Sequence, residues 1–181
     1  MKKYISILRG INVGGKRKIL MADLRNSLKA IGFQNVETYI QSGNMIFEAE
    51  ENQNKTFAQA IQSSIFKSHG FDVPVIVRTL SELKKAQDQN PFLKGKDPGI
   101  NQLHLTFLSE IPSPENLTKI KAYDYCPDQF EIVENNAFIK IPGKYHKSKL
   151  TNVFFEKKLD LQATTRNWKT VLKLIELAEG D

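Results

Sequence analysis

The residues with the greatest capacity for chemistry lie in one glycine-rich, basic stretch near the N-terminus. Residues 9–18 contain glycine at positions 10, 14 and 15, and then three consecutive cations, Lys16, Arg17 and Lys18. Glycine adopts backbone conformations that other residues resist, and adjacent positive charges attract an anion. An apolar run precedes this stretch and an amphipathic run follows it, so it reads as a loop between a strand and a helix. The stretch therefore predicts a site for an anionic ligand.

A second basic stretch, residues 140–150, carries four lysines and no acidic residue. The net charge of +6 is concentrated here and in residues 1–30, which hold eight Lys or Arg and one acidic residue. Residues 31–139 are net acidic. Two separate basic patches indicate local anion sites rather than a uniformly cationic surface. Two solvated faces that keep the protein soluble are the alternative explanation.

Size and composition place the chain among ordinary soluble globular proteins. Its 181 residues suffice for one large or two small domains, and 40% of them are hydrophobic and 25% charged. The apolar run after Met1 is too short for a signal peptide, and no stretch approaches the ~18 apolar residues of a membrane span. Cys126 is the only cysteine, so an internal disulfide is excluded. We expect a reduced cytoplasmic protein without a membrane partner; its oligomeric state is left open.

Hydrophobic periodicity predicts the element order β-α-β-β-α-β twice along the chain, without a matching repeat in the sequence itself. This order is that of a ferredoxin-like unit, so the expected class is α+β with two such units in tandem and a C-terminal helix after the second. The expected division is a first domain at 1–80, a linker with a short helix at 81–100, and a second domain at 101–181. The first unit has predicted strands at 3–9, 36–40, 45–49 and 73–79, and helices at 21–31 and from about Phe57 to Gly70. The second has strands at 103–108, 130–133, 138–141 and 162–165, and helices at 115–122, 148–158 and from Trp168 onward.

This topology brings the glycine-rich loop together with a second loop of the first unit. The first and second strands of a ferredoxin-like unit are parallel, and the third lies antiparallel between them. The ends of the first two strands and the start of the third therefore share one edge of the sheet. An alternative is that the glycines only turn the chain and that residues 42–44 are a hairpin tip. The expected ligand-binding residues at this edge are Arg9, Gly10, Asn12, Gly14, Gly15, Lys16, Arg17, Ser42 and Asn44.

The second basic stretch is expected to form a second anion site. The third and fourth strands of a unit end at the same edge, so residues 141–149 should lie beside residues 164–168. Both segments lead into helices, with Ser148 and either Thr165 or Asn167 as N-caps, and helix N-termini favour anions. Ordinary capping with solvated lysines is the alternative. The expected ligand-binding residues here are Lys144, Lys147, Arg166, Asn167 and Trp168.

Catalytic groups are sparse near both basic segments. His146 is the only histidine in either segment, so it is the one candidate for a general acid or base. No pair of carboxylates stands nearby, and we expect neither a metal nor a cofactor. Residues 10–16 match most of a Walker A motif, but Arg17 occupies the position where Ser or Thr would bind magnesium. This mismatch argues against a P-loop nucleotidase.

Nucleic acid is the other anion that the basic loops could bind. RNA-recognition domains share the ferredoxin-like plait and stack bases on aromatic residues of their central strands. The predicted third strand, residues 44–48, lacks their sequence signature. We therefore reject this stacking mode and retain binding of the nucleic-acid backbone by the basic loops.

Three motifs resemble a bacterial family known as domain of unknown function 1697. They are Leu8-Arg9-Gly10-Ile11-Asn12-Val13-Gly14-Gly15, Thr38-Tyr39-Ile40-Gln41-Ser42-Gly43-Asn44 and Thr165-Arg166-Asn167-Trp168-Lys169-Thr170-Val171. The resemblance covers essentially the whole chain and implies a pair of ferredoxin-like domains. Lys169 stands where the family often has Asn. The family carries no established activity, so the resemblance implies a fold and no reaction.

The leading hypothesis is a binding protein for an anionic, phosphate-bearing ligand, with nucleic acid as the preferred candidate. The alternative is an enzyme that acts on a small phosphorylated metabolite, in which His146 transfers a proton. A third is a protein-interaction module whose linker, residues 81–100, sets the angle between two domains.

Overall fold

The computed structural model of the protein describes residues 1–94 and 99–180. The chain forms two compact units, one of residues 1–84 with the C-terminal segment from Lys173, and one of residues 85–172. The boundaries of these units differ from the expected division at 80 and 100. They fall inside two helices, residues 80–89 and 168–179, each of which begins in one unit and ends in the other. Residues 95–98, part of the expected linker, lie outside the described residues.

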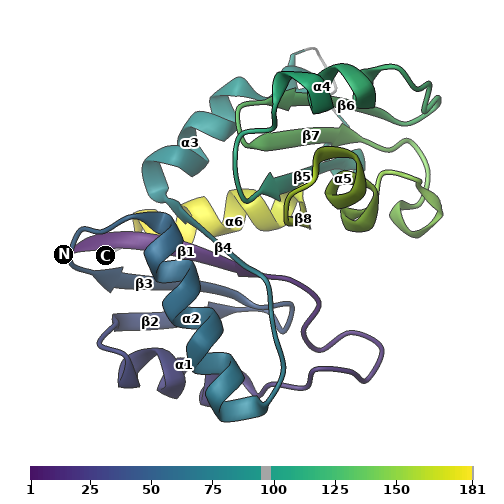
Figure 1. Ribbon diagram of the computed structural model, residues 1–181. Coiled ribbons are helices and arrows are strands. Elements are labelled where there is room, and N and C mark those ends of the chain that lie inside the picture. Colours follow the sequence, from purple (N-terminus) through teal and green to yellow (C-terminus); the bar gives the residue numbers. More distant parts are fainter. Residues whose placement is uncertain (95–98, 181) are drawn as a thin grey trace. The chain divides into compact units, whose positions relative to one another are not determined.

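Unit 1 is a four-stranded antiparallel sheet with two helices on one face (Figure 1). Its strand order is β2-β3-β1-β4, so β3 lies between β1 and β2, as the sequence predicts. The elements are β1 (Lys2–Leu8), α1 (Met21–Ala30), β2 (Gln34–Tyr39), β3 (Asn44–Ala49), α2 (Asn54–His69) and β4 (Val75–Thr79).

The core of unit 1 follows from the two hydrophobic periods of its sequence. Leu24 and Leu28 lie four residues apart on α1, and Phe57, Ile61 and Ile65 lie four apart on α2, so each helix buries one face. Alternate residues of the strands complete the same core. Aromatic rings lie at its centre: those of Phe33 and Phe47 stack at 4.3 Å, and those of Tyr4 and Phe57 are 4.6 Å apart.

Unit 2 repeats this architecture with the strand order β6-β7-β5-β8. Its core joins one face of the sheet to two helices through buried residues that include Leu108, Ile120, Ile139 and Phe155. The elements that follow β4 along the chain are α3 (Leu80–Gln89), β5 (Leu103–Leu108), α4 (Pro114–Lys121), β6 (Gln129–Val133), β7 (Asn136–Lys140), α5 (Asn152–Leu159), β8 (Ala163–Asn167) and α6 (Trp168–Glu179). Turns of 3₁₀ helix lie at 91–93, 100–102 and 145–147.

One predicted helix begins later than the sequence indicates. The expected helix at 148–158 is α5, which starts at Asn152, and its N-cap is Thr151, whose hydroxyl accepts from the Phe154 N–H at 3.2 Å. Ser148, the expected cap, instead donates to the Asp128 carboxylate at 2.7 Å and accepts from the Leu150 N–H. Its hydroxyl therefore holds the preceding loop, and the prediction of Ser148 as a cap is wrong.

The two units contain equivalent hydrogen bonds at equivalent positions of the fold. The Leu8 N–H donates to the Gly43 carbonyl in unit 1, and the Leu108 N–H donates to the Asn135 carbonyl in unit 2. Each bond joins the end of the unit's first strand to its β-hairpin turn. The last strands match as well, because Thr79 accepts from the Glu82 N–H and Asn167 from the Thr170 N–H. The protein is thus a tandem of ferredoxin-like units, as predicted.

Within the described residues, no helix is long and apolar enough to cross a membrane.

Candidate functional site

The glycine-rich stretch forms a small hairpin between β1 and α1 in unit 1. The Lys16 N–H donates to the Val13 carbonyl at 3.1 Å, and the φ angles of Gly14 and Gly15 are 59° and 73°. Positive φ at both central residues is typical of a type I′ turn, which glycine adopts without strain. The connection extends from the edge of the sheet as the purple loop of Figure 1. The hairpin presents residues 14–18 to solvent.

Asn12 closes the base of this hairpin. Its side-chain oxygen accepts from the Ile19 N–H at 2.9 Å, and its side-chain nitrogen donates to the carbonyls of Ile19 and Gln41, both at 3.0 Å. One side chain thus joins the two ends of the loop and binds them to the β2–β3 turn. The amide group of Asn12 is fully engaged, so in this structure Asn12 positions the site.

The β2–β3 turn lies beside the hairpin, as the topology predicts. Asn44 is buried and donates to the Tyr39 carbonyl at 3.1 Å and to the Ser42 hydroxyl at 3.0 Å. Gly43 has a φ of +81°, and a Cβ there would lie 2.7 Å from Ile11 Cδ1. Asn44 and Gly43 therefore fix the shape of the β2–β3 turn, whereas Ser42 is partly exposed.

The cations of the hairpin have no side-chain partner in the described part of the chain. Lys16, Arg17 and Lys18 are exposed, and within residues 1–94 and 99–180 their side chains form neither hydrogen bonds nor ion pairs. Elsewhere lysines do pair: Lys85 lies 2.6 Å from Glu134, and Lys119 lies 2.6 Å from Glu115. Three uncompensated positive charges on one turn create a local positive potential that favours an anion.

A cavity of about 460 Å³ opens at the base of the hairpin, entirely within unit 1. It includes two expected site residues, Asn12 and Gly15. His69 enters it because α2 ends at the same edge of the sheet at which β1 ends. The full lining is Asn12, Gly15, Lys18, Ile19, Leu20, Met21, Asp23, Gln41 and His69.

Sequence reasoning did not assign Gln41, Asp23 or His69 to this site. The topology that placed the β2–β3 turn at this edge also places the end of α2 there, since β4 starts beside Leu8. A signal for His69 was therefore present in the element order.

The first helix of unit 1 begins in this cavity without a side-chain cap. Leu20 occupies the N-cap position and is 71% exposed, and Met21 is the first helical residue. Serine or asparagine would normally satisfy the free N–H groups at this position. No side chain caps this end, which lies beside the cavity and adds a weak preference for negative charge.

The residues expected to form a second site all lie in unit 2, with different degrees of exposure. Lys144, His146 and Lys147 are exposed in the β7–α5 loop. Asn167 caps α6 by accepting from the Thr170 N–H at 2.8 Å, and Trp168 is fully buried against Phe138. Asn167 and Trp168 therefore have structural contacts that account for them.

Arg166, on β8, is held against its own strand. It donates to the Thr164 hydroxyl at 3.1 Å and the Thr165 carbonyl at 2.9 Å. Burial lowers the pKa of its guanidinium to about 10, and the nearby Tyr145 opposes this shift. Arg166 remains a cation at neutral pH.

A compact polar cluster in unit 2 was not expected. The rings of His104 and Tyr145 stack at 4.7 Å, and Thr165 lies 2.7 Å from the Thr106 hydroxyl and 2.6 Å from Asn152 Oδ1. Burial lowers the pKa of His104 and raises the pKa of the Tyr145 phenol. Both shifts favour the neutral form, so this cluster does not supply the positive charge of an anion site.

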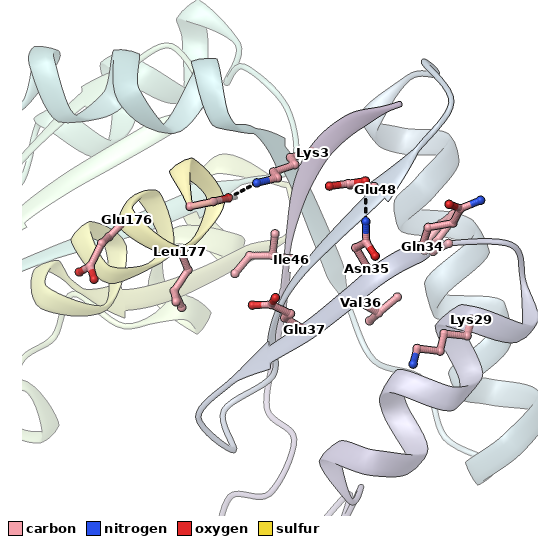
Figure 2. A pocket seen from close by; sticks show the side chains of 12 residues that line it. Lys3, Lys29, Gln34, Asn35, Val36, Glu37, Ile46, Glu48, Glu176 and Leu177 are labelled. Atoms are coloured by element: carbon pink, nitrogen blue, oxygen red, sulfur yellow. Dashed lines mark hydrogen bonds between the residues drawn. The ribbon is translucent and has the colours of Figure 1, made fainter.

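A larger cavity of about 850 Å³ in unit 1 contains none of the expected site residues. Figure 2 shows its carboxylates, Glu37, Glu48 and Glu176, on two strands and on the end of α6. The Asn35 side chain donates to Glu48 at 2.8 Å, and Lys3 donates to the Gly180 carbonyl. Its three carboxylates make it unsuitable for a phosphate group.

No group of three or more His, Cys, Asp or Glu side chains in the described residues is arranged to hold a metal ion. The structure brings the nine expected residues of the first set together in unit 1, where five of them belong to the hairpin, residues 12–18. It places the second set and His146 in unit 2. The two sets belong to different units.

Comparisons with known proteins bear on the fold and the family. The structure is similar to that of a conserved bacterial protein, SP0830 from Streptococcus pneumoniae, with a TM-score of 0.77 and 22% sequence identity over 98% of this chain and 99% of that one. At this identity the likeness shows the fold alone. No curated protein matches the chain. The model of a family described as "protein of unknown function (DUF1697)" matches residues 1–138, and the chain belongs to this family.

Proposed function

We propose that this protein binds a phosphate-bearing ligand at the basic hairpin of unit 1, and that the ligand is a nucleic acid. The observation that carries the proposal is a contrast between the two units. In unit 1, β1 and α1 are joined by residues 9–20, which include four cations; in unit 2, β5 and α4 are joined by residues 109–113, which include none. The fold therefore closes without the long basic connection, and a role in binding accounts for its length and charge.

The exposure of the cations favours a polymer over an enclosed anion. Lys16 and Arg17 lie on an exposed turn outside the cavity, and Lys18, which lines the cavity, is exposed as well. A nucleic-acid backbone presents successive phosphates, so several exposed cations bind it at once and release its counterions. The proposal places this binding in the bacterial cytoplasm, a location that suits the single, free thiol of Cys126.

A small phosphorylated metabolite is a second candidate ligand, favoured by the cavity beside the hairpin. Its volume of about 460 Å³ lies within the range of small-molecule sites, and Lys18 and Gly15 line it together with the uncapped start of α1. In this alternative one phosphate meets Lys18 and the helix end. It is tested by the shift in unfolding temperature on addition of phosphorylated compounds.

Fluorescence anisotropy with labelled DNA and RNA across a salt series tests the main proposal. We expect the affinity to fall as salt rises, with a slope of the log–log plot near −0.9 per phosphate contacted for duplex and about −0.7 for single strands. In the double variant Lys16→Glu/Arg17→Glu the affinity should fall at least tenfold and the slope should become shallower.

A matched control is Lys94→Glu/Lys157→Glu, which makes the same change of charge at two exposed lysines outside both basic loops. It should retain most of the affinity of the wild type. Equal losses in the two double variants would attribute binding to net charge alone. Absence of binding by the wild type at low salt would refute the proposal and leave the small metabolite as the candidate.

A further inference from the structure

We propose that the cavity beside the hairpin holds one unpaired base of a single strand, while the hairpin cations bind the flanking phosphates. This inference rests on the proposed function and extends it to a ligand class, single-stranded nucleic acid whose bases carry an exocyclic amino group. The cavity and the hairpin are continuous, because Gly15 and Lys18 belong to both.

The charges of this region separate the place of the phosphates from that of the base. Asp23 lines the cavity, and its carboxylate disfavours a phosphate beside it. Lys16 and Arg17 do not line the cavity and are exposed on the hairpin. A ligand that satisfies both regions is anionic outside the cavity and uncharged inside it. A nucleotide unit of a strand has this distribution.

The walls of the cavity suit the face and the edge of a base. Ile19, Leu20 and Met21 supply apolar surface, and apolar side chains can cover a base that has left its stack. Gln41 and Asp23 supply polar groups, and neither side chain forms a hydrogen bond or an ion pair within the part of the chain that the structure describes. An ionised carboxylate only accepts hydrogen bonds, so Asp23 favours the amino group of adenine or cytosine over thymine, whose one ring N–H lies between two carbonyl oxygens that repel a carboxylate.

A duplex cannot present a base in this way without unstacking it. Extrusion of a base from a duplex costs a few kcal/mol, and this cost is smallest in a single strand. The same surface exposes the apolar side chains of Val13, Leu20 and Ile40. An anionic membrane surface could also contact such side chains beside cations. However, an unpaired base offers partners to Gln41 and Asp23, which line the cavity without a side-chain hydrogen bond or ion pair among the described residues, and this observation favours the nucleic acid.

The test measures anisotropy of short labelled single strands of dA, dC and dT and of a duplex, with the full chain at low salt. We expect dA and dC to bind roughly tenfold more tightly than dT, in line with one well-placed base contact. The variant Asp23→Ala should lower the affinity for dA and dC roughly tenfold and leave dT unchanged. Gln41→Ala should act in the same direction. The control Asp72→Ala removes an exposed acid of unit 1 outside the cavity and should change nothing.

The sign of the Asp23→Ala effect separates the possible outcomes. If Asp23 merely repels phosphate, its removal raises the affinity for every strand equally, which overturns the base site and leaves binding by the hairpin intact. Equal affinity for duplex and single strands overturns it as well. If no nucleic acid binds the wild type, the proposed function fails and this inference fails with it. Vesicles containing anionic lipid are measured in parallel, and binding to them alone would assign the surface to a membrane.

Discussion

The two units of this protein share a fold, but the connection between their first strand and first helix differs in length and charge. In unit 2 the connection, residues 109–113, is short, and Ser113 caps α4 by accepting from the Asn116 N–H at 3.2 Å. In unit 1 the connection, residues 9–20, is long and basic, and α1 begins at Leu20 without a side-chain cap. The unit with the short connection satisfies its own helix end. In the unit with the long one, the start of α1 lacks a side-chain cap, and the side chains of Lys16, Arg17 and Lys18 have no partner among the described residues.

At the connection that follows the third strand, it is unit 2 that has the long basic segment. In unit 1, β3 and α2 are joined by residues 50–53, whereas in unit 2, β7 and α5 are joined by residues 141–151, which carry three lysines. Each unit thus has one extended basic connection, but the two are attached to different ends of the unit's sheet. A ferredoxin-like unit tolerates additions at either end, because its core depends on the strands and helices and not on their connections.

The largest difference in stability between matched substitutions should occur at the β-hairpin turns of the two units. Gly43→Ala should destabilise the protein by about 3 kcal/mol, because the new Cβ lies 2.8 Å from Leu8 Cβ and the φ of +81° is unfavourable for alanine. Asn135→Ala, at the matching turn of unit 2, should cost less than about 1 kcal/mol. Urea unfolding followed by circular dichroism measures both. Equal costs would show that the Gly43 turn relaxes readily.

The residue that closes the hairpin should have the next largest effect. Asn12→Asp keeps the acceptor for the Ile19 N–H but sets a carboxylate against two carbonyl oxygens, and we expect a loss of about 2 kcal/mol. Trypsin should then cut faster at residues 16–18, because the hairpin opens. Ser109→Ala, which removes one bond to the Gln162 N–H, is the counterpart in unit 2 and should cost about 1 kcal/mol. An unchanged rate of cleavage would contradict the role of Asn12.

Adding a cap to α1 and removing the cap of α4 should change stability in opposite directions, by smaller amounts. Leu20→Ser introduces the cap that α1 lacks and should stabilise the protein by about 0.5 to 1 kcal/mol, since Leu20 is exposed and its removal opens no cavity. Ser113→Ala should destabilise it by about 1 kcal/mol. Thermal unfolding reports both signs. If Leu20→Ser lowers stability, the exposed leucine makes a contact that its position does not indicate.

The pH dependence should be the smallest difference, and it should come from unit 2. His104 occupies the position that Tyr4 occupies in unit 1, and burial lowers its pKa below 6.5. The unfolded chain therefore binds more protons than the folded one as the pH falls below about 6.5, and stability decreases over that range. The unfolding temperature should fall on acidification, and His104→Gln should reduce that fall. An identical fall in the variant would assign the effect to other groups.

Much of the fold could be predicted because its elements have strong periodic patterns. The spacing of Leu24 and Leu28 and that of Phe57, Ile61 and Ile65 identified α1 and α2, and Gly70 marked the end of α2. The predicted start of α5 was wrong because more than one hydroxyl group could act as the N-cap, and tertiary contacts decide which one does. Ser148 bonds to Asp128, twenty residues away, and this leaves Thr151 as the cap. The sequence around Ser148 does not contain that partner.

The sequence by itself determined the element order, the tandem of ferredoxin-like units and the two basic segments, because periodicity and charge are local properties of the chain. Only the tertiary structure decided which residues share a cavity. Asn12, Gln41 and His69 line one cavity because the pairing of distant strands brings their segments to one edge of the sheet. Such contacts depend on packing between distant segments, and hydrophobic periodicity does not record which segments pack together.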